Sequence, residues 1–558
     1  MKVTRRDLLL WSAGAAAGLI VTPVPWKLLD DTSIWSQNWP WIPQPARGPV
    51  ELKRTSCTLC PNGCGMQVRM AAGWPVGVAG VRNHPASCGA LCPLAFGAHQ
   101  LNWHPKRLKT VRHRGGSSSW VEARTAFATA CGKGPVVVID GYPGRAASAV
   151  LETFGRKRGS YRVVVGPDIQ ALTPYEKWSG VPATALGYDL ENARTIVSFG
   201  APLLDGWGIP GRFSHLWAES AAGSSDPQLR LIQVEGSLSR TAARAWKWAP
   251  IRARSESALA AGMARVLLEE QLVVARGPMP PLSVDEAADQ TGLTPAAIHE
   301  LARMIVERTP AVVIANDDNP AIAALNVALG SVGTRGGIVR RSKRARAYVA
   351  ADNVISSART VLIDSSVPWD FSPQTDAEVF RFAAWDGGDE ASRRADWLLP
   401  APGFLEELTD VPTAPTFSTE TYAVAPALIK PATDSQSSVQ FLRSIDSSLS
   451  GVETIIHARS AELWRGRSGT VIGRETAHLA NFTSVQKFEE QLWKGAVWAG
   501  EPLRADGLQC KLSEWPAYVR SRHGDSWSSR WRQQVLPPLA TKLYRESTLR
   551  EPPELRSV

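Results

Sequence analysis

Four cysteines near the start of the chain place the strongest constraint on its fold. The spacing C-x2-C-x3-C-x27-C is formed by Cys57, Cys60, Cys64 and Cys92. Three thiolates from one short loop and a fourth from a later turn can hold the corners of a single [4Fe–4S] cluster. Pro61 and Gly63 favour the bent backbone that lets the sulfurs of this loop converge. The spacing therefore predicts an iron–sulfur domain over residues 51–113 whose chemistry is electron transfer.

Two other fates of these cysteines stay open. Zinc also accepts four thiolates, although structural zinc sites usually pair two C-x2-C units, and the x3 step is unusual for them. Disulfides or free thiols are the other alternative. Cys88 could compete as a ligand, but Cys92 directly precedes an apolar, helix-like stretch and is preferred. Cys131 and Cys510 stand alone, and we expect both to pack as small hydrophobic side chains.

The N-terminus carries an export pattern. Arg5 and Arg6 precede an apolar stretch from Leu8 to Val24, which is the arrangement of a twin-arginine signal. We interpret residues 1–30 as this signal, which exports proteins after they fold and receive their cofactor. The stretch has about 17 residues, at the lower limit for crossing a bilayer, and no A-x-A cleavage site follows it. The sequence therefore predicts a protein on the periplasmic side of the cytoplasmic membrane, with the uncleaved signal favoured as an anchor.

The composition is that of a large globular protein. The chain has 558 residues, of which 44% are hydrophobic and 20% charged, so it is long enough for several domains and a large core. Its formal net charge of +10 could favour nucleic acid or an anionic membrane surface. Because no Lys/Arg-rich helix with interleaved aromatic residues is present, we expect no nucleic acid partner. A membrane surface or an acidic partner subunit is favoured instead.

Short apolar strands alternate with helix-like segments through most of the chain. Strands are expected at 135–140, 161–166, 195–200, 229–234, 311–315 and 360–364, and helices at 120–130, 146–156 and 257–269. This alternation is typical of parallel sheets covered on both faces, so residues 114–449 are predicted to form α/β domains. Residues 31–50, rich in Pro and Trp, are expected to form a linker. Residues 450–558 are polar and poorly periodic, and we expect an extension that wraps a partner.

Two strand ends could hold phosphate groups. The turns at 140–144 and 200–206 lie where an α/β sheet binds its ligands. Neither turn has the G-x-G-x-x-G or Walker pattern. Taken alone, each is interpreted as an ordinary turn between a strand and a helix.

The cysteine segment and the body after it resemble the molybdopterin oxidoreductase family, the large subunits of complex iron–sulfur molybdoenzymes. Besides the cysteine spacing, the resemblance rests on segments 104–108, 193–200, 324–330, 336–337 and 395–400, followed by Glu406 and Glu407. It spans roughly residues 50–435. The resemblance implies a small N-terminal [4Fe–4S] domain followed by two Rossmann-like parallel-sheet domains. In the family these two domains surround a bis-pterin molybdenum cofactor.

Several positions depart from the family pattern. The family often has Lys or Arg two residues after the fourth cysteine, where this chain has Leu94. The family's metal ligand would fall within 168–175, which has no cysteine and offers only Asp168 and Thr173 as nominal candidates. The family's Asp-Pro-Arg is replaced by Glu235-Gly-Ser. A carboxylate there would repel a phosphate group that an Arg would attract.

The family's C-terminal β-barrel domain also has no recognisable counterpart, so the resemblance implies a scaffold that keeps the cluster and lacks a molybdenum site. This combination is similar to the molybdopterin-binding-like subunits of quinone-linked membrane complexes, of the menaquinone reductase and alternative complex III types. The resemblance implies an electron-transfer subunit at a membrane surface. Its implied partners are a ferredoxin-like iron–sulfur subunit, an integral membrane quinone-binding subunit and a multihaem cytochrome c.

Two other functions stay open. One is an active molybdenum–bis-pterin oxidoreductase that acts on a small substrate. The other is a structural subunit with zinc or an inert cluster. In the preferred interpretation no bond forms or breaks at a substrate, so no catalytic residue is expected. Lys53, Arg54 and Arg69 would favour reduction of the cluster if they lie near it.

Overall fold

The computed structural model describes residues 3–21, 48–204, 207–221, 227–274, 277–341, 348–349, 351, 355, 358–364, 376–386, 390–431, 433–501 and 508–517. The chain divides into two compact units, Met1–Glu51 with Arg69–Val76 and Leu52–Val68 with Gly77–Val558. Most of the linker expected at 31–50 lies outside the described residues.

Helix α1 (Arg5–Val21) covers most of the expected apolar stretch. Its first turn is closed by the Asp7 carboxylate, which accepts hydrogen bonds from the Thr4 backbone N–H (3.0 Å) and hydroxyl (2.6 Å). A carboxylate at this end complements the helix dipole. No helix in the described part of the chain combines the length and the apolar run needed to cross a bilayer. The end of the predicted stretch, up to Val24, lies outside the described residues.

The cysteine segment begins with a three-stranded sheet in the order β1–β2–β3. These strands are Val50–Ser56, Gly65–Ala71 and Trp74–Gly80. The loop between β1 and β2 carries the first three cysteines. The fourth cysteine directly precedes a short helix, α3 (Pro93–Gly97), and a 3₁₀ turn, η1 (Ala98–Trp103).

The largest sheet has seven strands in the order β5–β4–β16–β15–β14–β6–β7. The five strands from β16 to β7 are parallel, and β4 pairs antiparallel with β16 and β5. In chain order the strands are Arg112–His113, Gly116–Ser117, Val136–Asp140, Gly159–Val163, Thr360–Asp364, Glu378–Ala383 and Trp397–Pro400.

One face of this sheet is buried by α4 (Trp120–Lys133), α5 (Ala146–Arg158) and α14 (Ser438–Ile445). Aromatic rings fill the interface, and Phe127 meets Phe380 edge to face, with their centroids 5.0 Å apart. Such pairs add about 1 kcal/mol beyond the area that they bury. Apolar side chains such as Ile139 and Ile363 form a second core cluster from the same strands, because successive residues of a strand face opposite sides.

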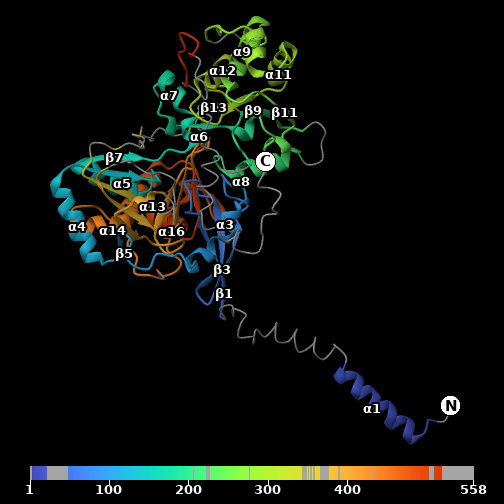
Figure 1. The fold of residues 1–558 in the computed structure, drawn as a ribbon, viewed down its shortest axis with the longest axis vertical. Helices are drawn as coiled ribbons and strands as arrows, with labels where there is room; N and C mark the ends of the chain where they lie inside the picture. The colour runs from blue at the N-terminus through green and yellow to red at the C-terminus, as the bar shows by residue number, and fades with distance from the viewer. Residues whose placement is uncertain are drawn as a thin grey trace. The chain divides into compact units, whose positions relative to one another are not determined.

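A second parallel sheet follows the order β11–β10–β9–β12. Its strands are β9 (Thr195–Phe199), β10 (Arg230–Val234), β11 (Lys247–Ala249) and β12 (Ala311–Ala315). Figure 1 shows α9, α11 and α12 gathered beside β9. The helices of this part are α8 (Pro210–Ala221), α9 (Glu256–Glu269), α10 (Val284–Thr291), α11 (Pro295–Glu307) and α12 (Pro320–Leu329). Helix α10 packs closely on α9. Gly262 of α9 lies so near to Ala287 of α10 that a Cβ added at Gly262 would be only 2.7 Å from the Cβ of Ala287.

Shorter elements connect these layers. The antiparallel pair β8 (Leu186–Tyr188) and β13 (Ile338–Arg340) is the fourth sheet. In the described part of the chain before residue 400, the other helices are α6 (Pro167–Gln170), α7 (Thr173–Ser179) and α13 (Glu390–Arg394). The 3₁₀ turns here are η2 (Ala183–Ala185), η3 (Leu190–Asn192) and η4 (Ala242–Arg244).

The described part of residues 450–558 contains regular helices and strands. An antiparallel sheet in the order β17–β18–β21–β19–β20 joins segments on both sides of residue 450. Its strands are Thr409–Pro412, Thr421–Ala425, Thr470–Ile472, Thr476–His478 and Val497–Ala499, with α15 (Val452–Gly466), η5 (Leu479–Asn481) and α16 (Val485–Trp493) between them. That residues 450–558 wrap a partner stays a prediction. The chain after residue 517 lies outside the described residues.

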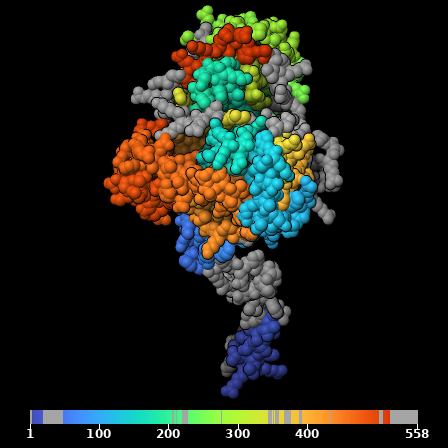
Figure 2. All heavy atoms as spheres, turned by 90° about the vertical axis from the view of Figure 1, so that its left-hand side faces the viewer, coloured from blue at the N-terminus to red at the C-terminus, as the bar shows by residue number. Residues whose placement is uncertain are grey.

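This C-terminal part packs on the first strand–helix unit of the body. Phe488, Leu492 and Trp498 share a core with Tyr422 of β18, and both α14 and α15 contact α5. Figure 2 shows the orange surface of this C-terminal part beside the cyan surface of the body. The predicted α/β class with parallel sheets is confirmed, and the strands expected at 311–315 and 360–364 coincide with β12 and β14.

Candidate iron–sulfur site and the adjoining cavity

The loop between β1 and β2 is closed on itself. The backbone N–H of Cys57 donates to the carbonyl oxygen of Cys64 (2.7 Å). Gly63 has a φ of 60°, and a Cβ added there would lie 2.2 Å from Cγ1 of Val411. Both observations require glycine before the third cysteine. The sequence therefore fixes a tight loop that directs its cysteines into the protein.

The fourth cysteine is held by a helix start. Cys92 is the residue before α3, with Pro93 in the first helical position. Burial raises the pKa of the Cys92 thiol, and the backbone N–H groups at the start of α3 oppose that rise. Leu94 itself is buried. The position where the family often has Lys or Arg is thus a buried apolar side chain that brings no charge.

The four thiols act on one another. Burial raises the pKa of each, in the case of Cys60 to about 12. The pKa of Cys64 rises further through the charges of the other three cysteines. Thiolates that repel one another in this way need a positive centre among them. The backbone N–H groups of Leu59 and Asn62 oppose the rise in the pKa of Cys57 and of Cys60, respectively.

These residues fit a [4Fe–4S] cluster. No three His, Cys, Asp or Glu side chains among the described residues group as ligands of a metal ion. The four ligands of a [4Fe–4S] cluster, however, surround four irons and not one metal ion. The observation that supports a cluster here is therefore the electrostatic effect of the thiols on one another. Of the other cysteines, Cys88 has its Sγ 3.9 Å from the carbonyl oxygen of Pro85. Cys131 and Cys510 pack against hydrophobic clusters, as expected.

The turn between β6 and α5 contacts the cysteine loop. The Tyr142 hydroxyl donates to the carbonyl oxygen of Leu59 (2.5 Å), and Nη2 of Arg145 donates to that of Thr58 (3.3 Å). The Arg145 guanidinium lies over the Tyr142 ring, 4.2 Å from its centroid. Its charge counteracts the rise in the pKa of Cys57 and Cys60.

The sequence did not point to Arg145; it offered Lys53, Arg54 and Arg69 as cations that would favour reduction of the cluster if they lie near it. Lys53 and Arg69 are exposed. Arg54 donates to the carbonyl oxygen of Gly473 and to Oδ1 of Asn83 (2.8 Å). The available signal was the turn at 140–144, a strand end of the kind that faces ligands, which Arg145 follows directly.

A cavity of about 660 Å³ adjoins the cysteine loop. It is bordered by Asn62 of the loop, by the β6–α5 turn, by the segment after β7, and by β17 and β18. Of the two nominal metal ligands, Asp168 lines this cavity, and burial raises its pKa to about 6. Thr173 borders a different cavity of about 260 Å³, beside Lys177. The structure thus brings only Asp168 to the larger cavity.

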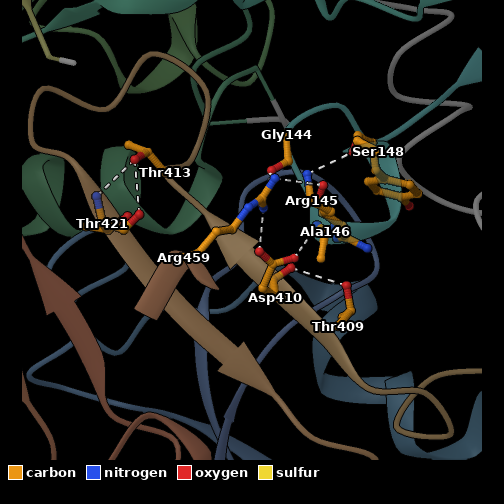
Figure 3. Close-up of polar contacts among 10 residues, drawn as sticks. Gly144, Arg145, Ala146, Ser148, Thr409, Asp410, Thr413, Thr421 and Arg459 are labelled. Carbon is orange, nitrogen blue, oxygen red and sulfur yellow. Dashed lines mark hydrogen bonds and ion pairs between the residues drawn. The ribbon is translucent and has the colours of Figure 1, made fainter. Parts of the chain in front are cut away.

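The start of α5 is already occupied by a carboxylate from another part of the chain. Oδ1 of Asp410 accepts a hydrogen bond from the backbone N–H of Ala146 (2.6 Å), and its side chain is fully buried. Nη1 of Arg459, on α15, donates to Oδ2 of Asp410 (2.6 Å) and to the carbonyl oxygen of Gly144 (2.8 Å), as Figure 3 shows. A helix start after a strand is where an α/β protein binds phosphate. Here Asp410 takes that position.

Two of the segments that carry the family resemblance meet in a buried ion pair. Arg107, in segment 104–108, pairs with Glu406 although 299 residues separate them, and their side chains are 2% and 0% exposed. Glu406 also accepts a hydrogen bond from the backbone N–H of Gly403 (2.6 Å). Nη1 of Arg107 donates to the carbonyl oxygen of Ala384 (3.3 Å). These contacts fix the end of the cysteine segment to the seven-stranded sheet.

Glu235 lies directly after β10. Its carboxylate accepts hydrogen bonds from Nε2 of Gln233 (3.1 Å) and from the backbone N–H of Ser239 (3.3 Å). The indole of Trp248 donates to its carbonyl oxygen (3.0 Å). The side chain expected to repel phosphate therefore holds its own turn.

Comparison with known proteins agrees with these features. Residues 50–102 match the family described as the molybdopterin oxidoreductase Fe4S4 domain. Over 519 residues the chain is 28% identical to the menaquinone reductase, molybdopterin-binding-like subunit, of Nitratidesulfovibrio vulgaris (strain Hildenborough), a match that covers 83% of this chain and 75% of the relative. The fold is similar to that of acetylene hydratase from Pelobacter acetylenicus, with a TM-score of 0.58 at 15% identity over 72% of this chain and 70% of that one. Residues 50–102 therefore match a molybdopterin oxidoreductase Fe4S4 domain, and the chain is similar over most of its length to a molybdopterin-binding-like subunit of a menaquinone reductase.

Proposed function

We propose that this protein is an electron-transfer subunit of a quinone-linked respiratory complex and relays electrons through one [4Fe–4S] cluster. The observation that carries the proposal is that four cysteine thiols, two of them buried and two half-buried, act electrostatically on one another within the segment that matches an Fe4S4 domain. The similarity to a menaquinone reductase subunit supports the link to quinone chemistry.

The chain's own residues give the cluster its setting. When bound, a [4Fe–4S] cluster takes up and releases single electrons. Cys57, Cys60, Cys64 and Cys92 would hold it. Backbone N–H groups at the sulfurs and the exclusion of water from the loop would tune its potential. No residue of the chain needs to act as an acid, base or nucleophile in this role.

We further propose that the protein works without molybdenum or pterin. A cavity of about 660 Å³ lies in the range of ~300–1,000 Å³ that suits one drug-sized ligand, and two pterin dinucleotides have several times as many atoms. A phosphate at the start of α5 would have to displace the buried Asp410 carboxylate from the Ala146 N–H and from Arg459. Both features support a scaffold that has lost this cofactor.

The proposed complex places the chain on the periplasmic side of the cytoplasmic membrane after export by the twin-arginine route. Arg5 and Arg6 at the start of α1, followed by exposed apolar side chains such as Leu9, support an export signal retained as an anchor. We propose a ferredoxin-like iron–sulfur subunit, an integral membrane quinone-binding subunit and a multihaem cytochrome c as partners.

Metal and pterin analysis of the purified full-length chain tests the proposal. The expected result is about four irons per chain, as one cubane requires, with no molybdenum, pterin or zinc. The variant Cys64→Ser should lose the cluster iron, because it removes a ligand from the closed loop. Cys131→Ser, at a cysteine that packs on the body, should keep the iron. Stoichiometric molybdenum with pterin, or one zinc without iron, would overturn the proposal.

A further inference from the structure

We propose that Arg145 sets the reduction potential of the cluster by placing a fixed positive charge beside the cysteine loop. This inference rests on the proposed function, because it requires the cluster to be present. It stands on the contacts between the β6–α5 turn and the loop that carries Cys57, Cys60 and Cys64.

The first argument is the attachment of Arg145 to the loop. Nη2 of Arg145 donates to the carbonyl oxygen of Thr58 (3.3 Å), and Tyr142 donates to the next carbonyl, that of Leu59 (2.5 Å). Thr58 and Leu59 are the two residues between the first and second cysteines. Two adjacent side chains of one turn therefore hold the segment that joins two ligands, which fixes the position of the guanidinium relative to their sulfurs.

The second argument is that the charge is permanent. A guanidinium stays protonated at any physiological pH. Cζ of Arg145 lies 4.2 Å from the centroid of the Tyr142 ring, and the face of this ring attracts the positive charge. Arg145 also acts on three carboxyl groups at nearby strand ends, those of Asp140, Asp364 and Glu407. Burial raises the pKa of all three carboxyl groups, so each carries less negative charge beside Arg145 than an exposed carboxylate would.

The third argument is the sign of the effect. A positive charge beside the segment that joins Cys57 and Cys60 favours the reduced cluster, which carries one more negative charge than the oxidised cluster. Cys57 and Cys64 are buried, so solvent screens a charge held against their loop less than it screens the charges of the exposed Lys53 and Arg69. Arg145 is thus a cation whose position is fixed next to the ligand loop.

A redox titration followed by electron paramagnetic resonance tests the proposal on the full-length chain. Arg145→Gln removes the charge and should shift the midpoint potential of the cluster to a more negative value. Arg145→Lys keeps the charge and should restore the midpoint most of the way to that of the wild type. The matched control is Arg156→Gln on the same helix, where the side chain is 72% exposed and pairs with Glu152; it should leave the midpoint unchanged.

Each result decides the matter. An unchanged midpoint in Arg145→Gln, equal shifts in Arg145→Gln and Arg156→Gln, or a midpoint in Arg145→Lys as negative as that in Arg145→Gln would overturn the proposal. Loss of the cluster from both Arg145 variants would assign Arg145 to holding the loop and would also overturn it. If only Arg145→Gln loses the cluster, a wild-type midpoint in Arg145→Lys supports the proposal and a lowered one overturns it. A wild-type chain without any cluster signal is a different failure, that of the proposed function.

Discussion

Single carboxyl groups near the start of α14 carry the clearest pH dependence. Burial raises the pKa of Glu407 to about 7, and its bond to the side chain of Ser437 opposes that rise only in part. Burial also raises the pKa of Asp364, at the end of β14, and the charges of Asp140 and Glu407 raise it further, to about 7. A helix start favours negative charge nearby and so lowers the pKa of a carboxyl group. Here that effect is smaller than the rise in pKa caused by burying several carboxyl groups together.

The sign of the effect follows from proton uptake. The folded pKa of Glu407, about 7, lies above the ordinary value of 4.5 for a glutamate side chain. Between these values the folded chain binds more protons than the unfolded chain, so the free energy of unfolding falls as the pH rises from about 4.5 to about 7.

Glu407→Gln removes this contribution and should stabilise the protein at pH 8 by about 2–3 kcal/mol while changing little at pH 4.5. Denaturant unfolding at both pH values measures it. Glu475→Gln, at an exposed turn between β19 and β20, is the matched control and should have no such effect. Equal stability of Glu407→Gln and wild type at pH 8 would contradict the assignment.

At the scale of elements, two buried ion pairs attach distant segments to the seven-stranded sheet. Arg107 and Glu406 join the end of the cysteine segment to the loop after β16, and burial lowers the pKa of Arg107 while Glu406 opposes that change. Asp410 and Arg459 join β17 and α15 to the start of α5. Breaking a buried pair on one side leaves an uncompensated charge inside the protein.

Glu406→Gln should lower the free energy of unfolding by about 3–5 kcal/mol, because it leaves the Arg107 guanidinium buried without a counter-charge. Glu490→Gln, in an exposed pair with Lys494 whose side chains are 58% and 64% exposed, should cost less than about 1 kcal/mol. Denaturant unfolding of both variants measures the difference. Similar small losses in the two variants would show that the Arg107 pair does not attach the cysteine segment.

Arg459→Ala should destabilise the protein by about 2–4 kcal/mol, somewhat less than for a fully buried pair, since the Arg459 side chain is 29% exposed. Arg459→Lys keeps the charge opposite Asp410 and should recover part of the loss. Thermal or denaturant unfolding measures both. A neutral Arg459→Ala variant would mean that Asp410 does not depend on α15 for its counter-charge.

At the scale of the whole molecule, the fold was predictable where burial leaves a local pattern. β12 and β14 were located to the residue because each is a short, mostly apolar run that is buried over at least four of its five residues. The strands β19 and β21 were missed because they have only three residues each, and β21 pairs with β18, far away in the sequence. Local pattern cannot report such non-local pairing.

The residues of the candidate site, too, were predictable from the sequence only in part. The four cysteines could be singled out because three of them lie within one short segment, and residues 50–102, which contain all four, match an Fe4S4 domain. Arg145 and Asp410 were missed because each acts through a contact between segments more than 80 residues apart. Of the nominal ligands, Asp168 reaches the cavity and Thr173 does not, since the chain turns into α7 between them.

Electron paramagnetic resonance of the dithionite-reduced full-length chain at low temperature tests the central claim most directly, because reduced [4Fe–4S] clusters and pentavalent molybdenum give distinct signals. The account predicts the signal of one reduced cluster, absent from Cys64→Ser, and no molybdenum signal at any potential during a titration. A silent wild-type sample, or a molybdenum signal that titrates with the protein, would contradict it.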